Sequence, residues 1–193
     1  MRSMVKNFIQ DQGGASAAEF AVILMLLMVL TFGVMDMGYA LWQWNNAEKA
    51  GQFGARLAAL STPLAPGLAT YECGTTATTA GQPCSQGGNS FGVVTCTGTG
   101  CTGGFGFSQA EADRLLARMQ MIFPRIQSEN LIVQYEDLQL AFDGRGSPVA
   151  SVTVRIVNMS FDFLILDLLL GFNTIAMPEF RTTLTTEDLR STG

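Results

Sequence analysis

Residues 20–35 read FAVILMLLMVLTFGVM, and this run decides how the chain can fold. No charged side chain interrupts it between Glu19 and Asp36, although 14% of the 193 residues are charged. Sixteen helical residues span about 24 Å, which is less than the roughly 30 Å hydrocarbon core of a bilayer. A membrane helix built on this run must therefore take in flanking residues. One of the two carboxylates then lies close to the membrane boundary.

The residues after the run mark the expected boundary. Tyr39, Trp42 and Trp44 follow it closely, as aromatic residues do at a membrane–water interface, and this places Asp36 near the rim. The N-terminal flank carries a small excess of positive charge. By the positive-inside rule, this excess favours a cytoplasmic N-terminus and an exported remainder.

The helical pattern continues well past the run, since the first proline is Pro63. Small residues recur at four-residue intervals between positions 47 and 59, and such spacing allows another helix to approach closely. The alternative is that alanine is simply a good helix former. A helix over residues 15–60 would be about 69 Å long, which disfavours a secretory signal cut near Gly38-Tyr39-Ala40. The expected packing residues are Ala47, Gly51, Gly54, Ala55 and Arg56.

A short motif precedes the run: Gly14 is followed by Ala-Ser-Ala-Ala and then by Glu19-Phe20. It resembles the site cut by a prepilin peptidase in type IV pilin-like proteins, where glutamate is the fifth mature residue. The resemblance implies a cut between Gly14 and Ala15, with Glu19 read by the peptidase. It also implies that Glu19 can meet the free amine of a neighbouring subunit. Alternatively, Glu19 merely lies among the lipid headgroups.

Residues 35–59, MDMGYALWQWNNAEKAGQFGARLAA, resemble the TadE-like family of the Tad (Flp) pilus system. In that family an acidic-x-Gly motif stands where the chain leaves the membrane, and an Ala-rich helix ends in Gly-Ala-Arg. Asp36, Gly38 and residues 54–56 stand at those places, although glutamate is usual where this chain has Asp36. The resemblance covers residues 13–60 well and residues 130–188 more weakly. It implies a minor pseudopilin of the bacterial inner membrane, with a prepilin peptidase and other pilins as partners.

All four cysteines lie after the apolar run: Cys73, Cys84, Cys96 and Cys101. In an oxidising compartment they predict two disulfides, with three connectivities open. We favour Cys73–Cys84 and Cys96–Cys101, because each closes a short loop. Zinc binding is disfavoured, because the cysteines have no C-x2-C spacing. The surrounding residues 61–107 are rich in Gly and Thr and lack an apolar pattern, so we interpret them as a disulfide-bearing insertion.

A second helix is expected to begin at Ser108, where Glu111 stands three residues on and would complete a capping box. Pro124 would end it. Its apolar stripe consists of Leu115, Leu116, Met119, Ile122 and Phe123.

Three strands are predicted after this helix, over residues 131–142, 149–157 and 174–186. Glu136 and Asp137 are adjacent carboxylates, but neighbours along a strand point to opposite faces. They cannot share a catalytic site, and we interpret both as solvated.

The segment FDFLILDLLLGF, residues 161–172, is too short to span a bilayer, and two aspartates interrupt it. A buried core segment is one interpretation. An exposed apolar lip that meets the membrane surface or another pilus component is a second, and another membrane span is a third.

These observations predict an α+β protein, in which a long N-terminal helix packs on an antiparallel sheet of three to four strands. The expected parts are a leader (1–14), the membrane and extended helix (15–60), the insertion (61–107), and a helix-plus-sheet domain (108–193). The chain has no histidine, a net charge of −5 and no basic cluster, which disfavour catalysis and nucleic-acid binding. We expect no cofactor and no small-molecule substrate. The expected role is non-enzymatic assembly, priming or tip structure of a Tad/Flp pilus, and hence adhesion; the alternative is an uncleaved single-pass envelope protein with a periplasmic ligand- or partner-binding domain.

Overall fold

The computed structural model describes residues 13–71, 90–140, 149–163 and 174–186, together with Ile165, Asp167 and Gly171. The chain divides into two compact units. The first contains the chain up to Trp42 and the segment Phe161–Ile175. The second contains Gln43–Ser160 and the chain from Ala176 onwards.

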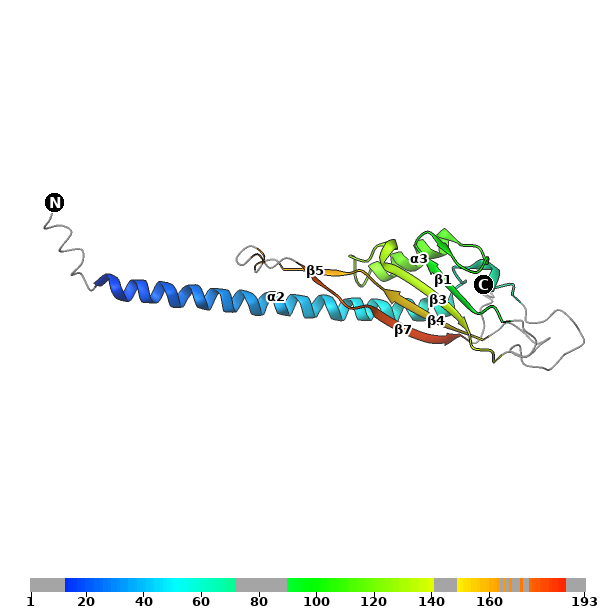
Figure 1. Ribbon diagram of the computed structural model, residues 1–193, viewed down its shortest axis with the longest axis horizontal. Helices are drawn as coiled ribbons and strands as arrows, with labels where there is room; N and C mark the ends of the chain where they lie inside the picture. Colours follow the sequence, from blue (N-terminus) through cyan, green and yellow to red (C-terminus); the bar gives the residue numbers. More distant parts are fainter. Residues whose placement is uncertain are drawn as a thin grey trace, which may run out of the picture. The chain divides into compact units, whose positions relative to one another are not determined.

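The longest element is helix α2, Gly13–Leu60, which has 48 residues and is about 72 Å long (Figure 1). The prediction of one long helix is therefore confirmed. Almost every side chain of the apolar run 20–35 is exposed, among them Phe20 at 64% and Met25 at 71%. Within the described residues, α2 is the one helix long and apolar enough to cross a membrane. A helix that is apolar on all sides needs lipid or protein around it.

A five-stranded antiparallel sheet forms the body of the second unit, with the strand order β2-β1-β3-β4-β7. The α+β class with a long helix and an antiparallel sheet is thus confirmed, but the expectation of three to four strands is too low. The additional strands, β1 and β2, arise in the Gly/Thr-rich segment that we interpreted as an insertion. The strands are β1 (Val93–Thr97), β2 (Gly100–Cys101), β3 (Leu131–Asp137), β4 (Ala150–Ile156) and β7 (Phe180–Thr186).

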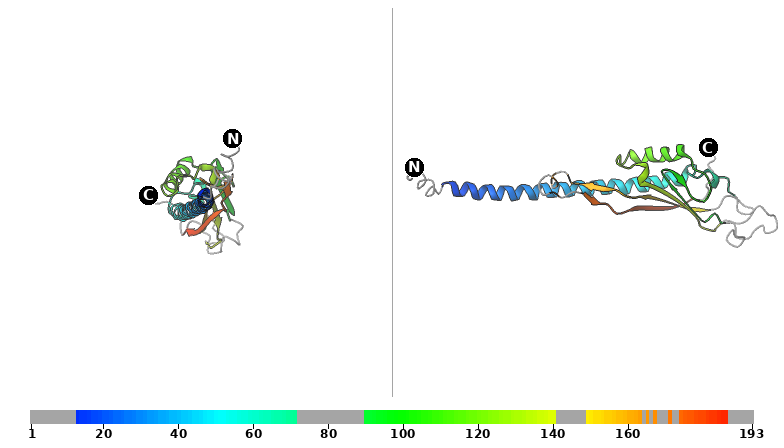
Figure 2. Two further views of the ribbon diagram at one scale, coloured as in Figure 1. Left: turned by 90° about the vertical axis from the view of Figure 1, so that its left-hand side faces the viewer. Right: turned by 45° about the horizontal axis from the view of Figure 1, so that its top comes forward.

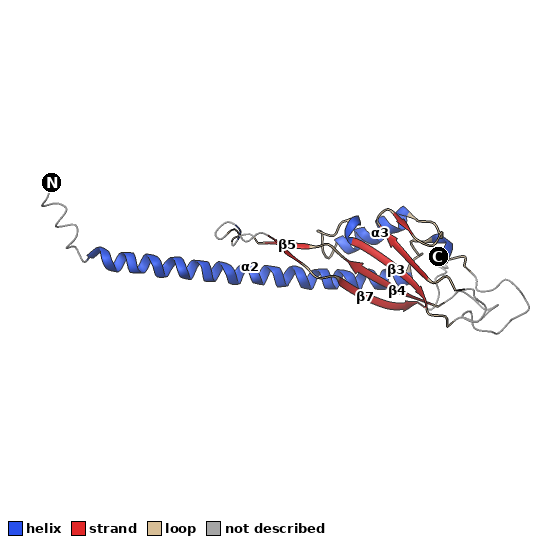
Figure 3. Cartoon of the chain, in the orientation of Figure 1, coloured by secondary structure: helices blue, strands red, loops and turns tan. Residues whose placement is uncertain are grey.

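The strand register gives the sheet one strongly buried face. Val94, Tyr135 and Val152 lie opposite one another on β1, β3 and β4, and none of them is exposed. The Gln43–Leu60 part of α2 and helix α3 (Gln109–Gln120) pack in this region, and the two views of Figure 2 show these helices side by side. Figure 3 colours the helices and the strands differently, so that the two can be told apart where they overlap.

Two glycines of α2 face the rest of the second unit, but only one of them is in a close approach. A Cβ placed on Gly54 would lie only 2.6 Å from the Met119 Sδ of α3. A Cβ placed on Gly51 would meet Thr182 and Ile156 at 3.6 and 3.7 Å, which are ordinary contact distances. The sequence prediction that small residues admit a close neighbour therefore applies most strictly at Gly54.

Helix α3 begins after Ser108 as predicted, but the capping box does not form. Ser108 makes no side-chain cap hydrogen bond. Glu111 instead accepts from Arg114 at 2.8 Å, since the two residues lie one turn apart on the helix surface. Leu115 and Met119 of the predicted stripe are buried in α3, and Leu116 is half-buried. The helix ends at Gln120 and not at Pro124, so Ile122 and Phe123 lie beyond it, half-buried and buried.

The predicted strand 131–142 ends at Asp137. Gln139 adopts a positive φ of 57°, and its N–H donates to the Asp137 Oδ1 at 2.8 Å. This local turn competes with the sheet ladder. The expectation that Asp137 is solvated is wrong: Asp137 is buried and faces the same side as Tyr135, whereas Glu136 is exposed.

The predicted strand 174–186 is divided in two. Residues Thr174–Ala176 form β6, which pairs with β5 (Ser160–Asp162) in a separate two-stranded sheet. The main sheet resumes only at Phe180. Pro178 lies in the gap and has no N–H to donate to a ladder, which explains the interruption.

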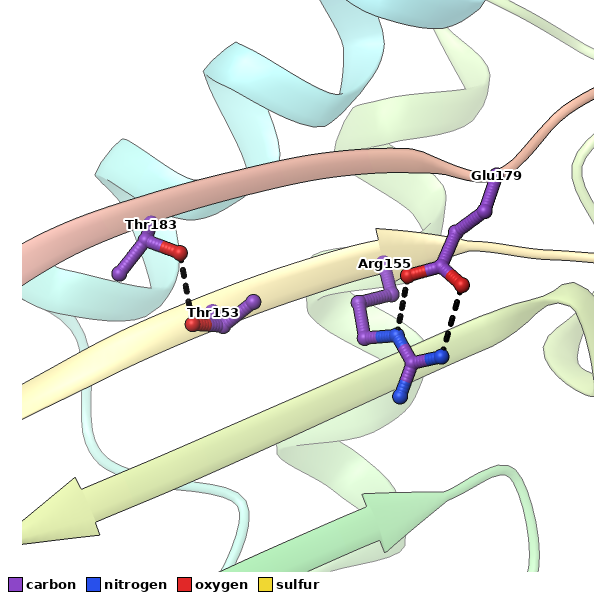
Figure 4. A network of polar contacts seen from close by, with 4 residues as sticks. All are labelled: Thr153, Arg155, Glu179 and Thr183. Atoms are coloured by element: carbon purple, nitrogen blue, oxygen red, sulfur yellow. Dashed lines mark hydrogen bonds and ion pairs between the residues drawn. The ribbon is translucent and has the colours of Figure 1, made fainter.

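Polar pairs join β4 to the β7 region on the opposite face of the sheet (Figure 4). The Thr153 and Thr183 hydroxyl oxygens lie 2.8 Å apart. Arg155 donates two hydrogen bonds to Glu179, and the Nη2–Oε2 bond is 2.7 Å long. This hydrogen bonding lowers the pKa of the Glu179 carboxyl, but the pair is exposed and solvent weakens its contribution to stability.

Tyr135 ties the sheet to the segment that follows α2. Its hydroxyl accepts from the Leu64 N–H at 3.0 Å, and its side chain is fully buried. Burial raises the pKa of Tyr135 from 10.0 to about 12, although the hydrogen bond from Leu64 acts in the opposite direction.

We predict opposite effects for two glycine-to-alanine substitutions. Gly51→Ala should raise the free energy of unfolding by up to about 1 kcal/mol, because alanine favours the helix and finds room. Gly54→Ala should lower it by about 1 kcal/mol overall, because overpacking against buried Met119 outweighs the helix gain. Chemical denaturation of the detergent-solubilised chain measures both. Equal effects of the two variants would show that the contact with Met119 does not limit how closely α2 approaches α3.

We also predict that alkaline pH destabilises the second unit through Tyr135. The unfolded tyrosine loses its proton near pH 10, whereas the folded one keeps it up to about pH 12. Stability is therefore lost as the pH rises through this window, by about 3 kcal/mol for a shift of this size.

The control for this prediction is Tyr135→Phe. At neutral pH it should cost about 1–3 kcal/mol, because the buried Leu64 N–H loses its acceptor. Its stability should then fall less steeply between pH 10 and 12 than that of the wild type. Parallel pH profiles for the two proteins would contradict the assignment.

Candidate functional site: the N-terminal helix

The predicted cleavage site lies at the beginning of α2. The backbone is helical from Gly13, so the Gly14–Ala15 bond falls within the first turn. Each glycine weakens a helix by about 1 kcal/mol, so this turn opens at low cost. Glu19 follows Ala15 by one turn and is exposed, as is Phe20.

Asp36 ends the apolar run and is buried, with an exposed fraction of 2%. Its Oδ2 accepts the backbone N–H of Ile165 at 3.0 Å, and both residues belong to the first unit. The sequence predicts that Asp36 lies at the membrane boundary, but it does not indicate Ile165 as a partner. Gly38, two residues on, has open space around its Cα.

The predicted aromatic belt has two parts. Tyr39 stacks on Trp42 with ring centroids 5.7 Å apart, and its other neighbour is Phe161 at 6.0 Å. Trp44 belongs to the second unit, where it meets the edge of Phe180 at 5.1 Å. Trp44 thus packs against the sheet, although 40% of its surface remains exposed.

The small-residue face of α2 is used within this chain. Ala47, Gly51, Gly54 and Ala55 are all buried, and the closest neighbours of the two glycines come from β4, β7 and α3. Arg56 points to solvent. One further residue, Gln43, was missed by the sequence analysis: it is buried and accepts from Arg125 at 2.8 Å.

The predicted disulfide between Cys96 and Cys101 is confirmed. The two residues are register partners at the β1–β2 turn, with Cα atoms 4.0 Å apart. The predicted Cys73–Cys84 pair lies outside the described residues. Within the part of the chain that the structure describes, no group of three or more acidic or cysteine side chains could hold a metal ion.

These features define a class: an N-terminal apolar helix that indicates membrane anchoring, continued by a helical segment packed on an antiparallel sheet. Comparison with family models adds a specific match, since the model described as TadE-like protein matches residues 14–56. The matched segment begins at Gly14 and ends at Arg56. No curated protein and no solved structure matches the chain. The match supports a protein related to the Tad pilus, and it covers α2 without the sheet.

We predict that Asp36 holds the backbone at Ile165 in place. Asp36→Ala removes the acceptor and should speed hydrogen exchange of the Ile165 amide by about tenfold, the effect of losing roughly 1.4 kcal/mol. Asp36→Asn keeps an oxygen acceptor and should retain most of the protection. Hydrogen exchange read by mass spectrometry measures both variants. Equal protection in all three proteins would show that the bond has no effect on this turn.

Proposed function

We propose that the chain is a TadE-like minor pseudopilin, processed after Gly14 by a prepilin peptidase and acting without catalysis in the assembly, priming or tip structure of a Tad/Flp pilus. One observation carries the proposal: the glycine-plus-glutamate segment begins α2 and also begins the family match. Adhesion would follow from the pilus itself.

The position of Glu19 supports a role between subunits. It is exposed at the edge of the apolar run. A carboxylate near hydrocarbon costs several kcal/mol unless it is paired. Cleavage after Gly14 would create a free amine at Ala15, and the same amine on a neighbouring subunit is a charge partner for Glu19.

Contacts with other pilins would use the exposed half of α2. The small-residue face between Ala47 and Ala58 is already covered by the chain's own sheet and α3. The run 20–35 is exposed over most of its surface, although Val29, Phe32 and Gly33 are half-buried, and its exposed side is available for helix–helix contacts in the membrane. The proposed topology has a cytoplasmic N-terminus, an inner-membrane helix and a periplasmic C-terminal part. The Cys96–Cys101 disulfide supports this topology, because disulfides persist in oxidising compartments.

The test is the N-terminal sequence and intact mass of the protein from native membranes, with and without the prepilin peptidase. The expected N-terminus is Ala15. Gly14→Ala should block cleavage and pilus assembly, and Glu19→Ala should reduce pilus assembly. Gly13→Ala is the matched control and should be cut normally.

An intact Met1 in cells that contain the peptidase would refute the proposal. So would normal pili in both the Gly14 and Glu19 variants. An intact Met1 would instead support an uncleaved single-pass envelope protein with a periplasmic binding domain.

A further inference from the structure

Strand β7 ends the five-stranded sheet, so one of its two edges has no neighbouring strand (Figure 1). Hydrogen bonds just outside the β3–β4 ladder show which backbone groups face that edge. The Leu138 N–H donates to the Val149 carbonyl, and the Val157 N–H donates to the Asn130 carbonyl. Both pairs continue the β3–β4 register, so the odd-numbered residues of β4 bond β3 and its even-numbered residues bond β7.

The β4–β7 register carries this alternation to β7. Ala150 lies opposite Thr186, so the even-numbered residues of β7 bond β4. Arg181, Thr183 and Thr185 therefore direct their N–H and C=O groups away from the sheet. The described residues supply no partner for these three N–H and three C=O groups. Because all seven residues of β7 pair with β4 without a bulge and none is proline, the free edge is a continuous template for one more strand.

The direction of β7 limits what can occupy this edge. Trp44 contacts Phe180, and Gly51, further along α2, lies next to Thr182. β7 and this part of α2 therefore run in the same direction. Two copies related by a two-fold axis perpendicular to the sheet would pair their β7 edges antiparallel, and their α2 helices would enter the pair from opposite ends. Two chains anchored through α2 in one membrane cannot adopt this arrangement.

The side chains of β7 define the chemistry of a suitable strand. Thr182 and Leu184 are half-buried on the core side of the sheet, so apolar side chains opposite them would extend their cover. Arg181 is exposed and lies opposite Arg155 on β4. These two cations share the carboxylate of Glu179, which bonds Arg155 and attracts Arg181. An acidic residue opposite Arg181 would therefore balance the second positive charge.

We propose that the outer edge of β7 binds an extended segment of a different protein chain as an added antiparallel strand. The segment bonds the outward N–H and C=O groups of Arg181, Thr183 and Thr185. It alternates apolar with polar residues and carries an acidic residue opposite Arg181. The proposal uses the anchoring of α2 only to exclude a two-fold dimer of this chain, and it does not depend on cleavage after Gly14.

A synthetic peptide tests this edge on the full chain in detergent micelles. The probe is Ser-Thr-Val-Thr-Val-Glu-Thr with blocked ends, which places its Glu opposite Arg181 in the antiparallel register. Hydrogen exchange of single amides is measured by NMR. The even-numbered amides of β7 should be protected without peptide, because they bond β4. With peptide at about ten times its dissociation constant, exchange of the Arg181, Thr183 and Thr185 amides should slow by about tenfold.

Two proline variants form a matched pair. Thr183→Pro removes an outward N–H and keeps the bonds to β4, so Leu184 should stay protected while the peptide no longer slows exchange at Arg181 and Thr185. Thr182→Pro removes an N–H that bonds β4 and should reduce the protection of the sheet itself.

The charge requirement is tested separately. Arg181→Thr should weaken binding of the peptide by about two- to fivefold. A peptide with Gln in place of Glu should bind the wild type and this variant equally.

The proposal is overturned if millimolar peptide leaves the three outward amides unprotected, or if the peptide slows their exchange equally in the Thr183→Pro variant. Protection of the same amides in the free chain, together with a disulfide-linked dimer of the Thr183→Cys variant, would overturn it in favour of a second copy as the occupant.

Discussion

The close approach of α2 to the chain's own sheet and to α3 is the constraint on which the second unit depends. A side chain at Gly54 would require buried Met119 to move, since a Cβ there would lie 2.6 Å from the Met119 Sδ, and buried alanines continue the same face. Because the α2 backbone lies close to the sheet and to α3, the side chains of β3, β4 and α3 can fill the remaining space without large residues from α2. Trp44 of α2 adds an edge-on ring contact with Phe180 of β7. A bulky residue at this face would displace the helix, and with it the packing of both neighbours.

Sequence patterns predicted the elements whose periodicity is long and regular. The 48-residue α2, the stripe of α3, and the cores of β3 and β4 were all found, because each repeats its apolar signal several times. The incorrect predictions concern elements whose structure is determined by a pairing or a local interaction. Val94 and Cys96 alternate over too few residues to indicate a strand, and β1 gains its stability from pairing with β3. The capping box at Ser108 was a sound local prediction that an ion pair between Glu111 and Arg114 replaced.

At the candidate site, too, patterns of adjacent residues could be interpreted from the sequence, and contacts between distant residues could not. The motif from Gly14 to Glu19 is readable because its parts are adjacent in sequence, and the boundary role of Asp36 was inferred from its neighbours. The bond from Ile165 to Asp36 could not be inferred, since 129 residues separate the two. Asp137 was misjudged for a related reason. A carboxylate is usually solvated, but the register places this one on the buried face of β3.

The two edges of the five-stranded sheet differ within the described residues. At one edge, β2 has only two residues, and the Cys96–Cys101 bridge ties it to β1. At the other, β7 has seven residues, rich in threonine, with one charged side chain. Short, crosslinked edges resist pairing with foreign strands, whereas long β-rich edges permit it. Of these two edges, β7 is therefore the one more open to pairing with a strand from outside.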